Sequence, residues 1–221
     1  MTSSILRAFA LLSLAALPAA AAPSAAPVSP ATAVTAQAQL DTVVFAGGCF
    51  WGVQAVFQHV KGVVSATSGY AGGTVANPEY EQVSSGRTGH AEAVRVVFDP
   101  SKVSYQTLLD VFFTVAHDPT ELNRQGPDVG TQYRSAIFFT SPAQHEATAK
   151  FVSALDKSGK YKRPIVTQIA SLRGFYPAES YHQDYATLHP DAPYIVYNDA
   201  PKIEALHKQY ASLWNDRIAA H

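Results

Sequence analysis

The stretch Phe45-Ala46-Gly47-Gly48-Cys49-Phe50-Trp51-Gly52 contains the only cysteine of the 221-residue chain. Residues 42–46 form an apolar run of strand length, and residues 49–60 carry apolar side chains at helical spacing. A strand, two glycines and a helix place Cys49 at a helix N-terminus, where free N–H groups and the helix dipole favour an anion. We therefore predict a Cys49 thiol with a lowered pKa and nucleophilic character. The alternative is an inert buried cysteine, but the glycine and aromatic neighbours favour chemistry.

The N-terminal residues have the composition of an export signal. The first 39 residues contain one charged side chain, Arg7. Residues 8–22 form an apolar run that ends in small residues, as in secretory signal peptides. Pro18 interrupts this run, which is shorter than the ~20 apolar residues needed to span a bilayer. We predict a signal peptide over 1–22, a disordered Ala/Pro-rich linker over 23–40, and export to the bacterial periplasm without stable membrane insertion after cleavage.

The remaining residues, 41–221, are long enough for one domain with a sizeable core. They carry all 17 acidic and 15 of the 16 basic residues, a net charge of −2. This balance gives no indication of nucleic acid or an anionic membrane as a partner. One cysteine cannot form an internal disulfide. Because a free thiol is easily oxidised in an exported protein, its presence there indicates that it has a chemical function.

Hydrophobic periodicity predicts a mixed fold. Strands are predicted over 42–46, 63–69, 91–98, 133–140 and 165–172, and helices over 49–60, 104–116, 142–157 and 200–218. Their alternation predicts an α/β (α+β) two-layer sandwich. Three long polar segments, 70–90, 117–132 and 173–199, are predicted to be functional loops, because loops of that length in a compact domain often carry function.

Several side chains are candidates for chemistry. Glu92 lies at the end of the apolar face of the strand over 91–98, where desolvation would raise its pKa and make it a proton donor. On spacing alone, a solvated glutamate at a strand end is the favoured alternative. Loop tyrosines can donate a hydrogen bond to a substrate or cap a core, and Asp128 is a turn residue by default.

Other kinds of site are weakly supported. The eight histidines are scattered without common metal-ligand spacing. His90-Ala91-Glu92 matches the H-x-E of zinc deaminases, but the required P-C-x-x-C is missing. We therefore predict no metal site. A Cys–His hydrolase or acyltransferase stays open, because the partner histidine can lie anywhere in the sequence.

Six motifs occur in order between residues 42 and 190. They are Gly47-Gly48-Cys49-Phe50-Trp51-Gly52, Asn77-Pro78-Glu79-Tyr80, Gly86-Arg87-Thr88-Gly89-His90-Ala91-Glu92, His117-Asp118-Pro119-Thr120, Gln125-Gly126-Pro127-Asp128-Val129-Gly130-Thr131-Gln132-Tyr133-Arg134-Ser135 and Ala178-Glu179-Ser180-Tyr181-His182-Gln183-Asp184-Tyr185. Together they resemble the peptide methionine sulfoxide reductases of type A. The resemblance implies reduction of methionine S-sulfoxide, free or in proteins, as repair of oxidative damage. It also implies a ferredoxin-like core with long catalytic loops.

The same resemblance implies the roles of individual residues. Cys49 attacks the sulfoxide sulfur and becomes a sulfenic acid, and Glu92 protonates the sulfoxide oxygen. The remaining implied residues are Tyr80 and Tyr133, which hydrogen-bond that oxygen, Phe50 and Trp51, which hold the ε-methyl group, and Asp128 and Tyr185, which shape the pocket. Pro127 stands where the family more usually has another residue, which leaves the geometry of its loop open.

The chain departs from the family in how its cysteine would be recycled. Many members carry a second cysteine near the C-terminus, and some carry one where this chain has Ser84. With neither present, we predict that an external thiol (thioredoxin-like, glutaredoxin-like or a small dithiol) attacks Cys49 through a mixed disulfide. We expect no bound cofactor and a monomer. A non-enzymatic binder of methionine sulfoxide is the alternative if no reductant reaches the exported protein.

Overall fold

A single six-stranded sheet organises residues 39–221. The computed structural model describes residue 1 and residues 39–221. Apart from Met1, the predicted signal peptide lies outside the described residues, as do all but the last two residues of the predicted linker. Two further short strands form a separate hairpin. Within residues 39–221, no helix combines the length and apolar character needed to cross a bilayer.

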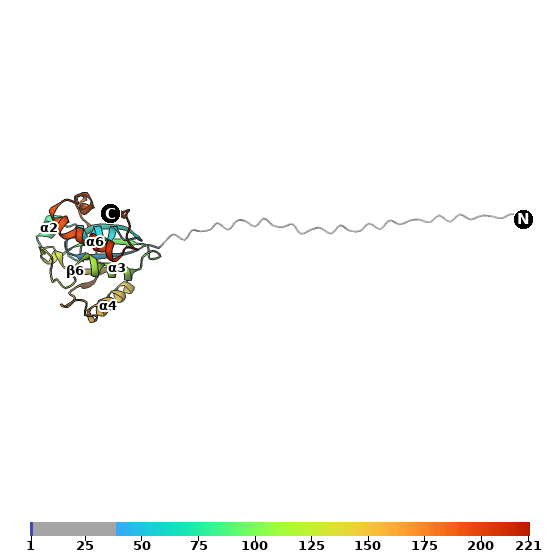
Figure 1. Ribbon diagram of the computed structural model, residues 1–221, viewed down its shortest axis with the longest axis horizontal. Helices are drawn as coiled ribbons and strands as arrows, with labels where there is room; N and C mark the ends of the chain where they lie inside the picture. Colours follow the sequence, from blue (N-terminus) through green and yellow to red (C-terminus); the bar gives the residue numbers. More distant parts are fainter. Residues whose placement is uncertain (2–38) are drawn as a thin grey trace. The chain divides into compact units, whose positions relative to one another are not determined.

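Strands and helices are intermixed along the chain (Figure 1). The strands are β1 (Asp41–Gly47), β2 (Val63–Ala71), β3 (Ala91–Phe98), β4 (Arg124–Gln125), β5 (Asp128–Val129), β6 (Ser135–Phe139), β7 (Gln168–Ser171) and β8 (Phe175–Pro177). The α-helices are α1 (Phe50–Gln58), α2 (Tyr80–Ser84), α3 (Tyr105–Val111), α4 (Pro142–Lys157), α5 (Tyr185–Leu188) and α6 (Ala200–Gln209). Shorter helical turns are η1 (Phe112–Ala116), η2 (Thr131–Tyr133), η3 (Ser180–His182) and η4 (Ile195–Asp199).

The central part of the sheet has the ferredoxin-like arrangement. The elements β1-α1-β2-β3-α3-β6 give the strand order β6-β1-β3-β2, in which every neighbouring pair is antiparallel. Strand β7 extends this core in parallel on β6 after α4, and β8 extends it on the other edge along β2. The predicted two-layer sandwich with a ferredoxin-like core is confirmed.

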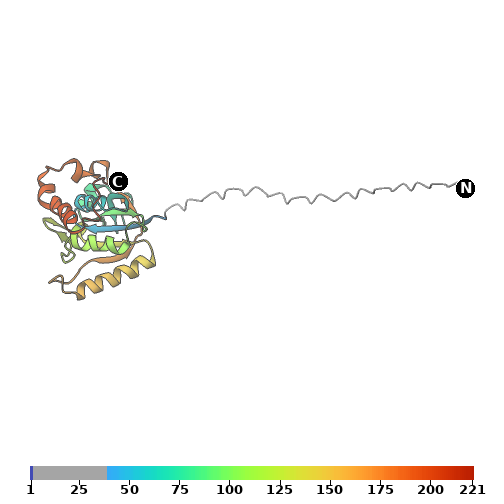
Figure 2. The same ribbon diagram turned by 45° about the vertical axis from the view of Figure 1, so that its right-hand side comes forward.

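The two faces of the sheet are buried in different ways. On one face, β1 meets α1 and η1 through stacked rings: the ring of Phe45 lies 4.9 Å from that of Phe57 and 4.6 Å from that of Phe112. Helix α4 lies beside α3 (Figure 2), and α6 packs against α1 and η1. The opposite face has a smaller cluster of mostly alanines, against which Leu172 and Phe175 pack. The large apolar core therefore lies under α1, the helix that begins beside Cys49.

The turn before α1 requires both of its glycines. Gly48 has a φ of +92°, which side chains rarely adopt, and a Cβ there would lie 2.5 Å from Cβ of Gln125. A Cβ on Gly47 would lie 2.9 Å from Cγ of His117. The chain can therefore reverse from β1 into α1 within two residues, and Cys49 becomes the N-cap residue of α1.

The C-terminal helix is shorter than predicted. The apolar spacing predicted a helix over 200–218, but α6 ends at Gln209. The chain beyond it turns back and pairs with the end of α1 and the start of β2: Lys61 N–H donates to Leu213 O at 2.8 Å, and Ala66 N–H donates to Ala220 O at 2.8 Å. This backbone pairing replaces the helical hydrogen bonds, while the same apolar side chains still pack on the core.

Replacing Gly48 by alanine is expected to destabilise the fold by about 1–3 kcal/mol, because the methyl group adds a clash with the Gln125 side chain to a strained φ. Urea unfolding measures this loss. The matched control is Gly159→Ala, where φ is +69° and no heavy atom lies within 4 Å of the added Cβ. The control should show only the backbone cost, about 1 kcal/mol. Equal losses in the two variants would contradict the steric role of Gly48.

Candidate functional site

Cys49 lies at the floor of a small cavity at the start of α1. Its residue is 8% exposed, and its side chain makes no capping hydrogen bond to the helix. The cavity has a volume of about 210 Å³. The residues that line it are Cys49, Phe50, Trp51, Tyr80, Glu92, Asp128, Tyr133 and Tyr194. The structure therefore brings together every residue that the family resemblance placed at the site except Tyr185.

The prediction of a lowered Cys49 pKa is wrong for this structure. Burial is the largest cause, and it raises the pKa of the thiol well above its ordinary value, with the nearby carboxyls of Glu92 and Asp199 acting in the same direction. The Trp51 backbone amide and the Lys202 ammonium lower it by less. The helix N-terminus alone does not decide the charge of the sulfur. In the resting site Cys49 is a thiol that still holds its proton.

Glu92 is a buried carboxylic acid. It lies in β3 opposite Tyr70 of β2 and is 2% exposed. Desolvation raises its pKa from 4.5 to about 8, although the Phe50 backbone N–H donates to its Oε2 at 3.1 Å and acts the other way. The alternative of a solvated glutamate at a strand end is therefore wrong. At neutral pH the cavity contains a proton that Glu92 can donate.

Tyr80 and Tyr133 supply two phenols to the same cavity. Tyr80 begins α2, where its backbone N–H donates to Glu179 at 2.8 Å, and Tyr133 ends the η2 turn that precedes β6. Burial raises the pKa of both, that of Tyr80 to about 12, so both keep their protons. Among the described residues, neither hydroxyl has a protein hydrogen-bond partner. Both are free to bind a polar atom of a ligand.

Phe50 and Trp51 form the apolar side of the cavity. The Trp51 indole N–H donates to Nδ1 of His182 at 3.2 Å, and its ring stacks on Tyr185 with centroids 3.9 Å apart. Tyr185 therefore holds Trp51 from behind and does not line the cavity, in contrast to its predicted place at the pocket. Sequence reasoning missed His182, whose ring also lies 4.5 Å from that of Tyr80. The only signal for it was its position inside the last motif.

Asp128 and Tyr194 close the cavity on its remaining side. The Tyr194 hydroxyl donates to Oδ2 of Asp128 at 2.5 Å. Asp128 is held there by the β4–β5 hairpin, whose two-residue turn is Gly126-Pro127 with φ of +55° at Gly126. This settles the loop geometry that Pro127 had left open. Tyr194 was also missed, since nothing distinguishes it from the other ten tyrosines in the sequence.

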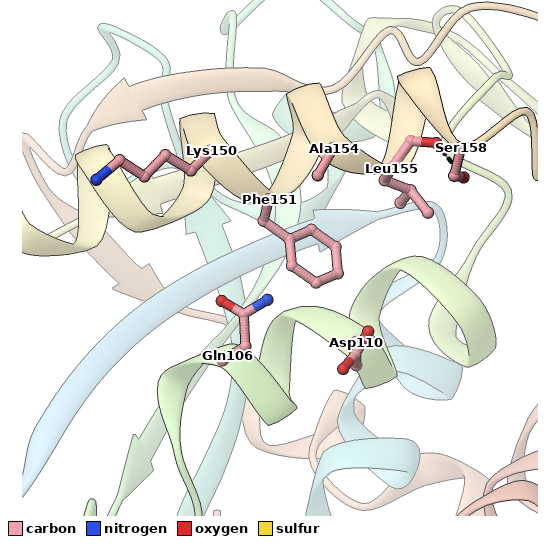
Figure 3. Close-up of a pocket in the computed structure, with 7 residues that line it drawn as sticks. All are labelled: Gln106, Asp110, Lys150, Phe151, Ala154, Leu155 and Ser158. Carbon is pink, nitrogen blue, oxygen red and sulfur yellow. Dashed lines mark hydrogen bonds between the residues drawn. The ribbon is translucent and has the colours of Figure 1, made fainter.

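The other candidate sites lack the groups that a reaction would need. No histidine lines a cavity that touches Cys49 in the described residues, so the Cys–His pair of a hydrolase is not formed. Residues 39–221 also contain no group of three or more His, Cys, Asp or Glu side chains that could hold a metal ion. A hollow of about 400 Å³ between α3 and α4 has Phe151 at its centre, between Gln106 and Asp110 (Figure 3). The residues that line it include no cysteine and no histidine.

A thiol, a carboxylic acid that keeps its proton and two free phenols face one small cavity beside an aromatic wall. This combination is that of a thiol-based oxidoreductase that acts on a small group carrying a polar oxygen.

Comparison with known proteins agrees with that class. The family model described as peptide methionine sulfoxide reductase matches residues 41–214. A peptide methionine sulfoxide reductase MsrA 2 of Mesorhizobium japonicum is 55% identical over 177 residues, 80% of this chain and 91% of the relative. The methionine sulfoxide reductase A structure of Corynebacterium diphtheriae has a TM-score of 0.67 at 36% identity, over 71% of this chain and 78% of that one. The reduced form of Mxr1 from Saccharomyces cerevisiae has a TM-score of 0.65 at 34% identity, over 70% and 88%.

The chain belongs to the peptide methionine sulfoxide reductase family, type A. It is a thiol-dependent enzyme that reduces methionine S-sulfoxide.

Burial of Glu92 predicts a specific pH dependence of stability. Its folded-state pKa of about 8 lies above the ordinary 4.5, so the folded protein retains a proton that the unfolded chain releases. The stability that this proton contributes is fully present below about pH 4.5 and is lost as the pH rises to about 8. We expect the Tm of the wild type to fall relative to that of Glu92→Gln between these values and the difference to level off above them.

Thermal melts of both proteins across this pH range measure the difference. The control is Glu81→Gln in α2, which removes an exposed carboxyl from the same part of the chain and should follow the wild type. A difference between wild type and Glu92→Gln that stays constant with pH would contradict a buried, protonated carboxyl.

Proposed function

We propose that the cavity at Cys49 binds the side chain of methionine S-sulfoxide with its oxygen toward Glu92, Tyr80 and Tyr133. The observation that carries this orientation is the convergence of one carboxylic acid and two unpartnered hydroxyls on one side of Cys49. A sulfoxide oxygen accepts hydrogen bonds but donates none, so three donors suit it. The ε-methyl group then packs on Phe50 and Trp51. Burial of a methyl group contributes about 0.8 kcal/mol, and sulfur–aromatic contact adds to it.

The first step uses the two protons that Glu92 and Cys49 hold in the resting site. Glu92 transfers its proton to the sulfoxide oxygen, which makes the sulfoxide sulfur electrophilic. The Cys49 sulfur attacks that sulfur, and its own proton returns to the Glu92 carboxylate. The oxygen passes to Cys49, which gives methionine and a Cys49 sulfenic acid. The raised pKa of Cys49 is compatible with this order, because ionisation of the thiol follows protonation of the substrate and adds no net charge to the cavity.

We further propose that an external dithiol, either a thioredoxin-like or glutaredoxin-like protein or a small molecule, reduces the sulfenic acid. The chain offers no second cysteine to form an internal disulfide. The thiol would form a mixed disulfide with Cys49, and a second thiol would release the Cys49 thiol. The working enzyme in this proposal is a monomer without a bound cofactor, acting on free or protein-bound methionine sulfoxide.

A single turnover without reductant tests the residue roles. Enzyme mixed with excess L-methionine S-sulfoxide is expected to form one equivalent of methionine, and mass spectrometry should find Cys49 heavier by one oxygen atom. Cys49→Ser should form no methionine. Glu92→Gln should form it about 10²–10⁴-fold more slowly, since positioned proton transfer contributes that much. The control Glu81→Gln should match the wild type. Full activity of Glu92→Gln would contradict the proton-donor role.

We also propose that the protein is exported to a bacterial periplasm, on the basis of the signal-peptide pattern over 1–22. When the full chain is expressed in a Gram-negative host, the periplasmic fraction should contain a protein that has lost about the first 22 residues. Leu12→Asp, which places a charge in the apolar run, should leave the uncleaved chain in the cytosol, whereas Thr32→Asp in the linker should not. An uncleaved wild-type chain in the cytosol would contradict export.

A further inference from the structure

Cys49 borders a second, smaller cavity. Its volume is about 70 Å³. The residues that line it are Cys49, Gln125, Gly126, Pro127, Asp128, Tyr194, Asn198 and Lys202. It shares Cys49, Asp128 and Tyr194 with the larger cavity in which methionine sulfoxide is proposed to bind. It lacks the Glu92 acid, the two free phenols and the Phe50 and Trp51 wall of that cavity. The hydrogen-bonded pair of Asp128 and Tyr194 thus borders both cavities, and Cys49 is accessible from two different sets of residues.

The second cavity contains a cation, which the first lacks. Lys202 is the only cationic side chain among the residues that line the two cavities. Its ammonium lies 3.0 Å from Oδ1 of Asp199, and the Lys202 side chain is 17% exposed. The Asp199 carboxyl is fully buried, and its Oδ2 has no hydrogen-bond partner. Asp199 packs so closely on α1 that a Cβ on Gly52 would lie 2.1 Å from its Oδ1. The Asp199 carboxyl therefore holds Lys202 beside the first turn of α1, where Lys202 lowers the pKa of Cys49 by less than Asp199 raises it.

Reduction of a sulfenic acid by a thiol requires that the thiol reach the sulfur from the side opposite the leaving oxygen. Displacement at a divalent sulfur proceeds with the attacking and leaving atoms in line through that sulfur. In the proposed orientation the sulfenic oxygen of Cys49 faces Glu92 and the phenols. The attacking thiol must therefore approach from the side away from that cavity. A volume of 70 Å³ equals about two water molecules, since each occupies about 30 Å³ in the liquid, and this suits a CH₂–S group.

We propose that the smaller cavity is the binding site for the reducing thiol and that Lys202 binds it as its thiolate. This proposal rests on the proposed sulfenic acid at Cys49. The thiolate sulfur forms a bond to the Cys49 sulfur as the S–O bond breaks, and the hydroxyl leaves as water with the proton of Glu92. The proton of the incoming thiol restores the Glu92 acid. A second thiol then attacks the outer sulfur of the mixed disulfide, the reductant leaves as a disulfide, and Cys49 is reduced.

Lys202→Met tests this proposal when the two half-reactions are measured separately. Methionine formation in a single turnover is measured first for each variant and gives the amount of sulfenic acid that enters the second half-reaction. The second-order rate constant for reduction of the sulfenic acid should fall about tenfold with an anionic thiol such as 2-mercaptoethanesulfonate, as expected for loss of one steering cation. It should fall less with dithiothreitol and least with the cationic thiol cysteamine. Lys202→Arg should restore most of the rate with the anionic thiol.

Two further variants separate a local charge effect from misfolding. Lys208→Met removes another lysine of α6, which also pairs with an acid but lines neither cavity, and should behave as the wild type. Asp199→Asn combined with Lys202→Met leaves no buried carboxylate unpaired and should show the same dependence on thiol charge as Lys202→Met.

The outcomes also separate the two proposals. Wild-type enzyme that forms no methionine without reductant would overturn the proposed function. Normal methionine formation with equal losses for all three thiols, or with no loss, would overturn the role of the smaller cavity alone. A protein dithiol in place of the small thiols shows whether the same cavity serves a protein reductant: an equal tenfold loss would extend the assignment to it, and an unchanged rate would restrict it to small thiols.

Discussion

The hydrogen bond between the Phe50 backbone N–H and the buried Glu92 carboxyl joins the two parts of the active site. Glu92 belongs to the middle of the sheet, whereas Phe50 begins the helix that follows Cys49. The bond places the acid beside the sulfur and also takes up a helix N–H that would otherwise favour a thiolate. Burial dominates the charge of both groups, so the site stores two protons in place of a carboxylate and a thiolate.

This storage of protons suits a reaction that moves an oxygen atom. A sulfoxide oxygen leaves its sulfur only when it is protonated, so a general acid contributes more than a free thiolate would. A Cys49 thiolate beside an ionised Glu92 would place two like charges in a low dielectric. The structure avoids that state, and the positive charge of Lys202 lies in the second cavity that borders Cys49, where an external thiolate is proposed to arrive.

Sequence reasoning predicted the sheet core, α1 and α4 closely because each depends on local periodicity or on turn residues. It also placed Cys49 at the correct turn, since the Gly47-Gly48 pair has few other uses. It failed where tertiary contacts decide the outcome. The pKa of Cys49 depends on burial by segments distant in sequence, and the choice of Tyr194 over Tyr185 as the lining residue depends on how the η4 turn packs. No local pattern encodes either.

The fold of the C-terminal residues is consistent with recycling by an external thiol. Residues 210–221 contain no cysteine and are tied to the rest of the domain by backbone hydrogen bonds, such as that from Ala219 N–H to Gln58 O at 2.9 Å. The side chain of His221 also lies 2.8 Å from the Asp184 carboxyl. A segment held in this way packs against the C-terminal end of α1. Cys49 lies at the other end of that helix, and each helical residue between them adds about 1.5 Å to the separation. The segment therefore serves the stability of the domain, and the approach to Cys49 is left to η4, the start of α6 and the β4–β5 hairpin.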